Sequence, residues 1–248
     1  MNLKKIKPQY LKKPNPRVGL IALASDFMIE KDFSNVIGGR KIDFFVNRIK
    51  CYNPLTSKNL IKMSKEVTSV TKDILPDQKI DCVVYGCTSG TIAAGYRSIE
   101  KKIKKAKPNT KVTTPSTAAI KALRKMEIKK ISVFTPYPKK LNNEVIDFLK
   151  KEKFIITSNS YFDIKSDIDI GKVDPEYLFK VLSRMDHKNA DALFVSCTAL
   201  PVLSILNRLE KKIKKIVISS NQALIWDTLE KIGKNNSITN FGKLFKAN

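Results

Sequence analysis

Two short segments of the chain each place a cysteine and a threonine directly after an apolar run. The first is VVYGCTSGT, from residue 83 to residue 91, and the second is LFVSCTALP, from residue 193 to residue 201. Each apolar run predicts a buried strand, and the residues after each cysteine indicate the start of a helix. Cys87 and Cys197 are 110 positions apart in a chain of 248 residues. This duplication predicts two thiols that face one another across a shared cleft.

A thiol between a strand and a helix lies near the positive end of the helix dipole, so we expect its thiolate to be stabilised. Two facing thiols have two natural uses. One removes a proton beside a carboxylate while the other returns a proton from the opposite face. Alternatively, one thiolate adds to a carbon–carbon double bond, the resulting single bond rotates, and elimination of the thiolate gives the other geometric isomer. Both paths build negative charge on an enolate, which the hydroxyls of Thr88, Ser89 and Thr198 are expected to stabilise.

The remaining cysteines and the single histidine favour no rival chemistry. The chain has four cysteines, no CxxC pair and no histidine-rich segment, so we expect reduced thiols and neither a zinc site nor disulfides. Cys82 and Cys51 are interpreted as small buried hydrophobes. His187 stands in a polar stretch at a predicted helix end and is expected on the surface, which argues against a Cys–His dyad. Without a glycine-rich phosphate loop, no cofactor is expected.

The net charge of +24 suggests a nucleic-acid partner if it is taken alone. The excess, however, comes almost wholly from lysines spread along every predicted helix, and aromatic residues do not interleave with them. We therefore interpret the lysines as a solvated surface that can steer anionic substrates. A basic nucleic-acid-binding protein remains the alternative from another class.

The pattern of strands and helices predicts an α/β fold. Residues 1–16 are basic and rich in proline, and are interpreted as an arm. Strands are predicted near residues 17–24, 42–49, 81–86, 111–114, 130–135, 153–158, 191–196 and 214–219. Helices are predicted near residues 56–74, 90–102, 117–126, 139–151, 175–187, 200–211 and 221–232. Strands that alternate with helices imply parallel sheets.

The duplication favours two pseudo-symmetric domains, each a parallel sheet flanked by helices. We assign residues 17–118 and 221–248 to the first domain and residues 119–220 to the second. No run of about 18 apolar residues is present, so no membrane span is predicted. No apolar signal core follows the first residues, and we expect a cytoplasmic protein.

Polar clusters fall where the predicted strands end, which is where α/β sheets bind ligands. Such clusters begin at Ser25, Cys87, Thr113, Thr135, Ser196 and Ser219. Hydroxyl and amide groups at helix N-termini bind carboxylates well. They are equally ordinary helix caps, and for Ser116 and Ser220 taken singly the cap is the favoured interpretation.

These segments together resemble the aspartate/glutamate racemase superfamily, and within it the branch of maleate cis–trans isomerase, arylmalonate decarboxylase and the ectoine-utilisation proteins. The resemblance rests on GCTSGT from residue 86, TPSTAA from 114, TPY from 135, SCTAL from 196 and SSNQALIW from 219. It implies a pair of pseudo-symmetric α/β domains, no cofactor and an active site at their interface.

The resemblance implies that Cys87 and Cys197 are the thiol pair. It further implies that Thr88, Ser89, Tyr137 and Thr198 contact a carboxylate or enolate. Decarboxylases of this branch carry glycine in place of the first cysteine, so Cys87 favours isomerisation or racemisation.

Maleate isomerases carry asparagine where this chain has Asp26. An ionised aspartate repels a carboxylate, so we expect the substrate to present an amino or amide group there. The chain is thus predicted to be an isomerase or racemase of a small carboxylate, with a homodimer as a candidate assembly and an arylmalonate-type decarboxylase as the alternative function. The loops at residues 25–40 and 158–173 are expected to set specificity, and Asp163, Asp167 and Asp169 are equally well contacts or solvated charges.

Overall fold

The computed structural model describes residues 4–11, 14–234 and 238–247. Within these residues the strands form two parallel sheets of four strands each. The first sheet has the order β2 (Asp43–Ile49), β1 (Arg17–Leu23), β3 (Cys82–Gly86) and β4 (Lys111–Thr113). The second has the order β6 (Ile155–Tyr161), β5 (Lys130–Thr135), β7 (Ala192–Val195) and β8 (Ile216–Ser219).

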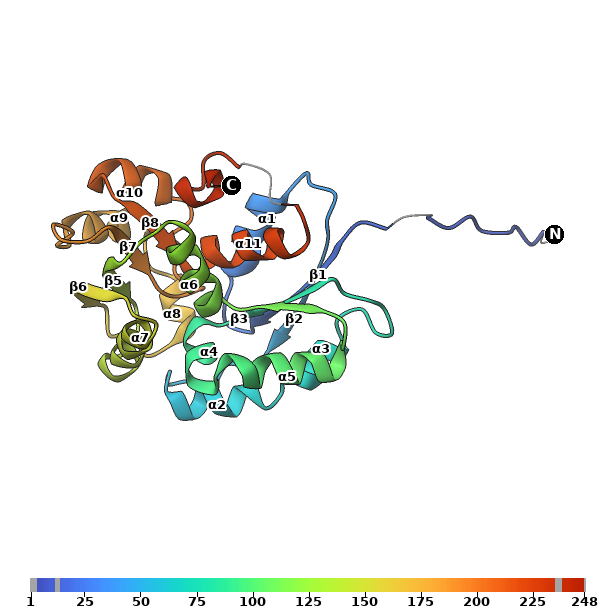
Figure 1. The fold of residues 1–248 in the computed structure, drawn as a ribbon. Coiled ribbons are helices and arrows are strands. Elements are labelled where there is room, and N and C mark those ends of the chain that lie inside the picture. Colours follow the sequence, from blue (N-terminus) through green and yellow to red (C-terminus); the bar gives the residue numbers. More distant parts are fainter. Residues whose placement is uncertain (1–3, 12–13, 235–237, 248) are drawn as a thin grey trace.

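Helices cover both sheets and give the molecule two lobes (Figure 1). The first half contains α1 (Ile29–Ile37), α2 (Ser57–Ser64), α3 (Val67–Lys72), α4 (Thr88–Ala94), α5 (Tyr96–Ala106) and α6 (Pro115–Lys125). The second contains α7 (Lys139–Lys151), α8 (Asp167–Gly171), α9 (Pro175–Arg184), α10 (Leu206–Ile213), α11 (Ser220–Lys231) and the 3₁₀ helix η1 (Lys243–Lys246). The helices α6 and α11 pack against each other where the lobes meet.

The two sheets repeat one topology. In each, the first strand in the chain pairs with the second on one side and the third on the other, and the fourth pairs with the third. This confirms the predicted α/β class and the pseudo-symmetry of its halves. Cys87 follows β3 and Cys197 follows β7, so each cysteine follows the third strand of its sheet. Both therefore lie at the carboxyl edge, where parallel sheets bind ligands.

The central strands form where the sequence is continuously apolar. In β1, every residue from Val18 to Leu23 is buried, and its register sets Leu20 beside Val84 of β3 and Val46 of β2. A parallel strand covered by helices on both faces needs such a run. The edge strand β2 is half-buried and confirms the strand predicted near residues 42–49. From the sequence, the apolar stretch from Ile42 to Val46 is interpreted as a strand or as part of a dimer interface, and the second possibility stays a prediction.

The predicted helices differ from the structure in length and number. The predicted helix at 56–74 is two helices, α2 and α3, and the one at 90–102 is divided into α4 and α5 by Gly95, which has a φ of 79°. Glycine adopts this conformation without the steric cost of a side chain. The predicted helix at 200–211 begins only at Leu206. The helices α8 and η1 were not predicted, because they have only five and four residues. The helix α1 was missed although Ile29, Phe33, Val36 and Ile37 recur with helical spacing and are buried.

The predicted arm has no helix or strand at residues 4–11 and extends away from the lobes (Figure 1). Residues 1–3, 12 and 13 of this arm lie outside the described part of the chain. Among the described residues, no helix is long and apolar enough to cross a membrane. The domain boundaries inferred from the sequence remain a prediction.

We predict that Ile21→Ala lowers the free energy of unfolding by about 2 to 5 kcal/mol, since Ile21 is fully buried in the centre of β1 and a cavity would remain. The control is Ile155→Ala in β6, because that side chain is 56% exposed. Urea unfolding of both variants gives the comparison. Equal losses would contradict the placement of the core.

Candidate active site

Hydrogen bonds join the two cysteine segments across the lobes. The Thr198 hydroxyl donates to the carbonyl oxygen of Gly86 over 3.3 Å. The Thr88 hydroxyl donates to Ser220 Oγ over 2.9 Å. Thr198, next to Cys197, therefore contacts the first cysteine segment, and Thr88, next to Cys87, contacts Ser220 after β8. These bonds bring together the carboxyl ends of β3, β7 and β8.

Ser220 also holds the backbone at Cys197. Its Oγ accepts a hydrogen bond of 3.0 Å from the Cys197 amide. Cys197 has a φ of 148°, which L-residues rarely adopt and which costs about 1 to 3 kcal/mol unless the surroundings enforce it. Such strain is concentrated at functional sites. The role of Ser220 is thus to position this strained turn, and the expected cap of α11 is Ser219 instead.

The two cysteines differ in their relation to a helix. Cys87 is the N-cap of α4, and its Sγ accepts a hydrogen bond of 3.2 Å from the Gly90 amide. Ser89 Oγ lies 3.9 Å from the same sulfur. Cys197, in contrast, is followed by irregular chain as far as α10. The prediction that both thiols start a helix is therefore correct for Cys87 and wrong for Cys197.

Burial raises the pKa of both thiols above the ordinary value. Each sulfur-bearing side chain is almost fully buried, and the charge of Asp167 raises the pKa of both further. The Gly90 amide lowers the pKa of Cys87, and a hydrogen bond with Tyr137 lowers that of Cys197. These contributions are smaller than burial, so the predicted net stabilisation of the free thiolates is wrong.

Two buried tyrosines lie beside the thiols. Burial raises the pKa of Tyr137, and so do the charges of Cys197 and Cys87, which sets this phenol within electrostatic reach of both sulfurs. A Cβ on Gly90 would lie 2.7 Å from Cys87 Sγ and 2.9 Å from the hydroxyl of Tyr85. That hydroxyl has no hydrogen-bond partner within the described chain. Tyr85 was missed from the sequence, because it is part of an apolar strand pattern.

Asp26 is fully buried at the carboxyl end of β1. One carboxylate oxygen accepts hydrogen bonds from the amides of Met28 and Ile29, at 2.8 and 3.0 Å, and so pairs the first amide of α1. Burial raises the pKa of this carboxyl, and the two amides oppose the shift. The other oxygen, Oδ2, accepts no hydrogen bond among the described residues, because the nearby Thr198 hydroxyl donates to Gly86. That hydroxyl and the charge of Arg48 nevertheless lower the pKa of Asp26, against the larger effect of burial. The predicted site residue thus has a structural oxygen and a free one.

Asp167 lies at the site, whereas Asp163 and Asp169 are exposed. Its Oδ2 accepts a hydrogen bond of 2.6 Å from Ser25, which crosses from the second sheet's half to the first. Burial raises its pKa to about 7, and the charge of Asp26 adds to the shift. Of the three aspartates that the sequence left open, this is therefore the one that belongs to the site.

Cys51 lies nearer the site than its interpretation as a core residue suggested. It is half-buried, and burial together with the charge of Asp167 raises its pKa to about 11.

His187 corrects a second expectation. It is buried rather than on the surface, with its ring nitrogens within 2.8 Å of Ser132 Oγ and the Leu182 carbonyl oxygen. Its bonds are structural, as expected for a histidine outside the site.

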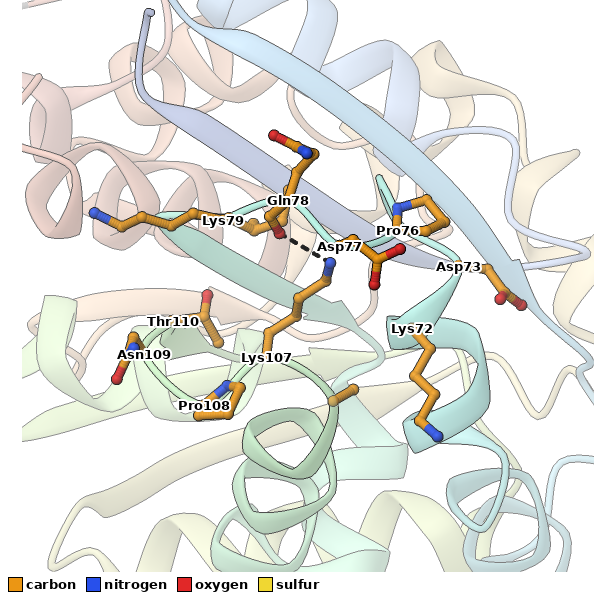
Figure 2. A pocket seen from close by; sticks show the side chains of 12 residues that line it. Lys72, Asp73, Pro76, Asp77, Gln78, Lys79, Lys107, Pro108, Asn109 and Thr110 are labelled. Atoms are coloured by element: carbon orange, nitrogen blue, oxygen red, sulfur yellow. Dashed lines mark hydrogen bonds between the residues drawn. The ribbon is translucent and has the colours of Figure 1, made fainter.

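A pocket of about 520 Å³ opens at the opposite edge of the first sheet (Figure 2). It is lined by the turns before β3 and β4, and Lys107 Nζ donates hydrogen bonds to the carbonyl oxygens of Leu75 and Gln78 there. These bonds close a loop at the amino ends of the strands. The pocket is therefore remote from the cysteines, which lie at the carboxyl ends.

We expect Ser220→Ala to lower the free energy of unfolding by about 1 to 3 kcal/mol, because the buried Cys197 amide and Thr88 hydroxyl would lose their acceptor. Ser69→Ala is the control, since its exposed hydroxyl bonds only within its own helix region. Urea denaturation measures both. A loss no larger than that of the control would show that the junction does not depend on Ser220.

Asp167 makes stability depend on pH in a defined direction. Its folded-state pKa of about 7 lies above the ordinary 3.8, so the protonated form contributes stability at low pH that is lost as the pH rises through 7. Relative to wild type, Asp167→Asn is therefore expected to be more stable at pH 8 than at pH 4. Thermal unfolding across this range tests the sign. Asp169→Asn, on the same helix but exposed, is the control and should give no such gain.

Comparison with characterised proteins finds relatives along nearly the whole chain. A maleate isomerase from Geobacillus stearothermophilus is 24% identical over 246 residues, which cover 93% of this chain and 97% of the relative. A maleate isomerase from Alcaligenes faecalis is 21% identical, with 93% and 96% covered. An arylmalonate decarboxylase from Bordetella bronchiseptica is 26% identical over 136 residues, or 54% of this chain and 57% of the relative.

Solved structures share the fold. The maleate isomerase of Pseudomonas putida, in a mutant crystallised with maleate, superposes with a TM-score of 0.87 at 22% identity, over 94% of this chain and 98% of its own. A liganded double mutant of arylmalonate decarboxylase superposes with a TM-score of 0.83 at 21% identity, over 94% of this chain and 100% of its own. The sequence profile of one family, arylmalonate decarboxylase, matches residues 66–245. Both cysteine segments and most of the fold fall within that match, and the chain therefore belongs to the arylmalonate decarboxylase family, within the racemase-like branch that its motifs predicted.

Proposed function

We propose that this protein is an isomerase or racemase that acts on a small carboxylate through Cys87 and Cys197, without a cofactor. The observation that carries the proposal is the pair of hydrogen bonds from Thr198 to Gly86 and from Thr88 to Ser220, which ties the two cysteine segments together. Family membership and the maleate isomerase relatives support it. The two thiols would then act on one substrate from opposite sides.

For cis–trans isomerisation, one thiolate adds to a carbon of the double bond while the other thiol gives a proton to the neighbouring carbon. The former double bond is now single and rotates. Loss of the proton and departure of the sulfur restore the double bond in the other geometry, so the thiol and thiolate are regenerated. A mutant of the Nocardia farcinica maleate cis–trans isomerase was crystallised with a covalently bound succinylcysteine intermediate. An adduct of that kind is what this path requires here.

For racemisation, one thiolate removes the proton next to the carboxylate and the other thiol returns a proton on the opposite face. The same residues serve, because both paths pass through an enolate-like state. The hydroxyls of Thr88, Ser89 and Thr198 and the phenol of Tyr137 are the proposed donors to it. In this assignment Tyr137 has a second role, since its hydrogen bond with Cys197 favours the thiolate.

Asp26 is the proposed contact for a substrate amino or amide group. Its Oδ2 is buried without a partner in the described chain, and a buried carboxylate oxygen requires a donor. An amino-acid derivative supplies one, whereas a second carboxylate supplies none. We therefore favour an amino-acid derivative over maleate as the natural substrate.

An arylmalonate-type decarboxylase is the second candidate, and the matching family profile favours it. Cys87 argues against it, because the decarboxylases of this branch resemble the chain but carry glycine at that position. Release of carbon dioxide from arylmalonates would distinguish the two functions. If that release depended on Cys197 but not on Cys87, the decarboxylase would be the correct assignment.

We predict that Cys87→Ala and Cys197→Ala each lower turnover by about 10² to 10⁴-fold, as expected when one of two acid–base or nucleophilic groups is removed. Deuterium exchange from solvent, followed by proton NMR on candidate substrates, measures this and reports which face each thiol serves. For a racemase, exchange at one face can survive in a single mutant while racemisation is lost.

The matched control is Cys82→Ala, because Cys82 is fully buried in β3 and serves only as a core side chain. It should keep wild-type turnover if the protein remains folded. Wild-type turnover in both Cys87→Ala and Cys197→Ala would exclude the two-thiol mechanism.

A further inference from the structure

Two buried carboxyls approach the thiols from opposite halves of the molecule. Asp26 follows β1 in the first half, and Asp167 begins α8 in the second. The Ser25 hydroxyl donates a hydrogen bond of 2.6 Å to Asp167. Since Ser25 directly precedes Asp26 in the chain, this bond brings Asp167 to the segment that carries Asp26. The charges of both raise the pKa of Cys197, which sets them within electrostatic reach of that sulfur.

Neither carboxylate has a basic side chain as its partner within the described chain. Arg48 approaches Asp26 but donates to the backbone carbonyl oxygen, at 2.9 Å, and pairs with Glu30 instead. This holds although lysine and arginine exceed acidic residues by 24 in the sequence. The charge of Arg48 lowers the pKa of Asp26 but forms no ion pair with it. A buried carboxylate without an ion-pair partner is costly, and Oδ2 of Asp26 accepts no hydrogen bond.

The donor set does not suit a metal ion. In the described part of the chain, no group of three or more His, Cys, Asp or Glu side chains could hold one. When they are ionised, the two carboxyls present only acceptors, and hydroxyl and amide groups of the protein already use one oxygen of each. An organic cation with N–H donors matches the acceptor that Asp26 leaves unused and the negative charge of both groups when ionised.

Resting on the proposed function, we infer that Asp26 and Asp167 together bind a positively charged nitrogen of the substrate, an ammonium or amidinium group. The substrate class is then a small carboxylate that also carries a cationic nitrogen. Such a cation neutralises the carboxylates that oppose ionisation of Cys197, so binding itself favours the thiolate. A dicarboxylate such as maleate would instead add negative charge to the site.

Two probes of matched shape test this inference. Maleate carries two carboxylates, and cis-γ-aminocrotonate replaces one of them with an aminomethyl group, which is protonated at neutral pH. We expect wild type to bind the amino probe about tenfold or more tightly than maleate, as for a charge-assisted hydrogen bond. Calorimetry on the full chain measures binding, and NMR follows cis–trans conversion of each probe.

The variants Asp26→Asn and Asp167→Asn should each reduce the ratio of the two affinities by about tenfold, and Asp169→Asn should leave it unchanged. The ratio is internal to each protein, so a general loss of stability does not alter it, and thermal unfolding identifies any variant that fails to fold. A loss of preference in both variants supports the inference, whereas wild-type preference in either variant that folds contradicts the joint site.

Equal or tighter binding of maleate by wild type would overturn the inference, as would failure of the amino probe to bind. The proposed function is judged separately by the two cysteine variants. Conversion of maleate that depends on both cysteines, without preference for the amino probe, would retain the mechanism and reject the cationic substrate.

Discussion

The structure depends most on the hydrogen-bonded junction between the carboxyl ends of its two sheets. Ser220 accepts from the Thr88 hydroxyl on one side and from the Cys197 amide on the other, so one buried oxygen connects β3, β7 and β8. Each donor is buried and would be costly without this acceptor. The same bonds fix the strained backbone of Cys197, which means that the cohesion of the lobes and the placement of the thiol have a common origin.

The electrostatics of the junction oppose ionisation of the thiols. Burial and two aspartates raise the pKa of Cys197, while only short-range donors such as the Tyr137 phenol lower it. These surroundings therefore favour the neutral thiol over the thiolate. Under the proposed cationic substrate, a ligand that brings positive charge would offset these carboxylates and favour the thiolate.

The fold and the strand-end residues could be predicted from the sequence because their signals are local. Apolar runs such as that of β1 indicate buried strands, and the repeated Cys-Thr pattern indicates the equivalent positions after β3 and β7. The thiol pKa could not be predicted in the same way, since it depends on burial by the whole molecule. Nor could the place of Asp167, which a short unpredicted helix brings next to Ser25 across 142 positions of sequence.

The burial of Asp167 could not be predicted from the sequence around it, because it depends on contacts with a distant part of the chain. In the sequence it is one of three aspartates in a polar loop, and its neighbours Asp163 and Asp169 do remain in solvent. Its burial arises because α8 closes against the first half, where Ser25 supplies the hydrogen bond. The closure places a second carboxyl opposite Asp26 and leaves both without a basic partner in the described chain. The pair of buried carboxyls therefore arises from the assembly of the two halves rather than from either half alone.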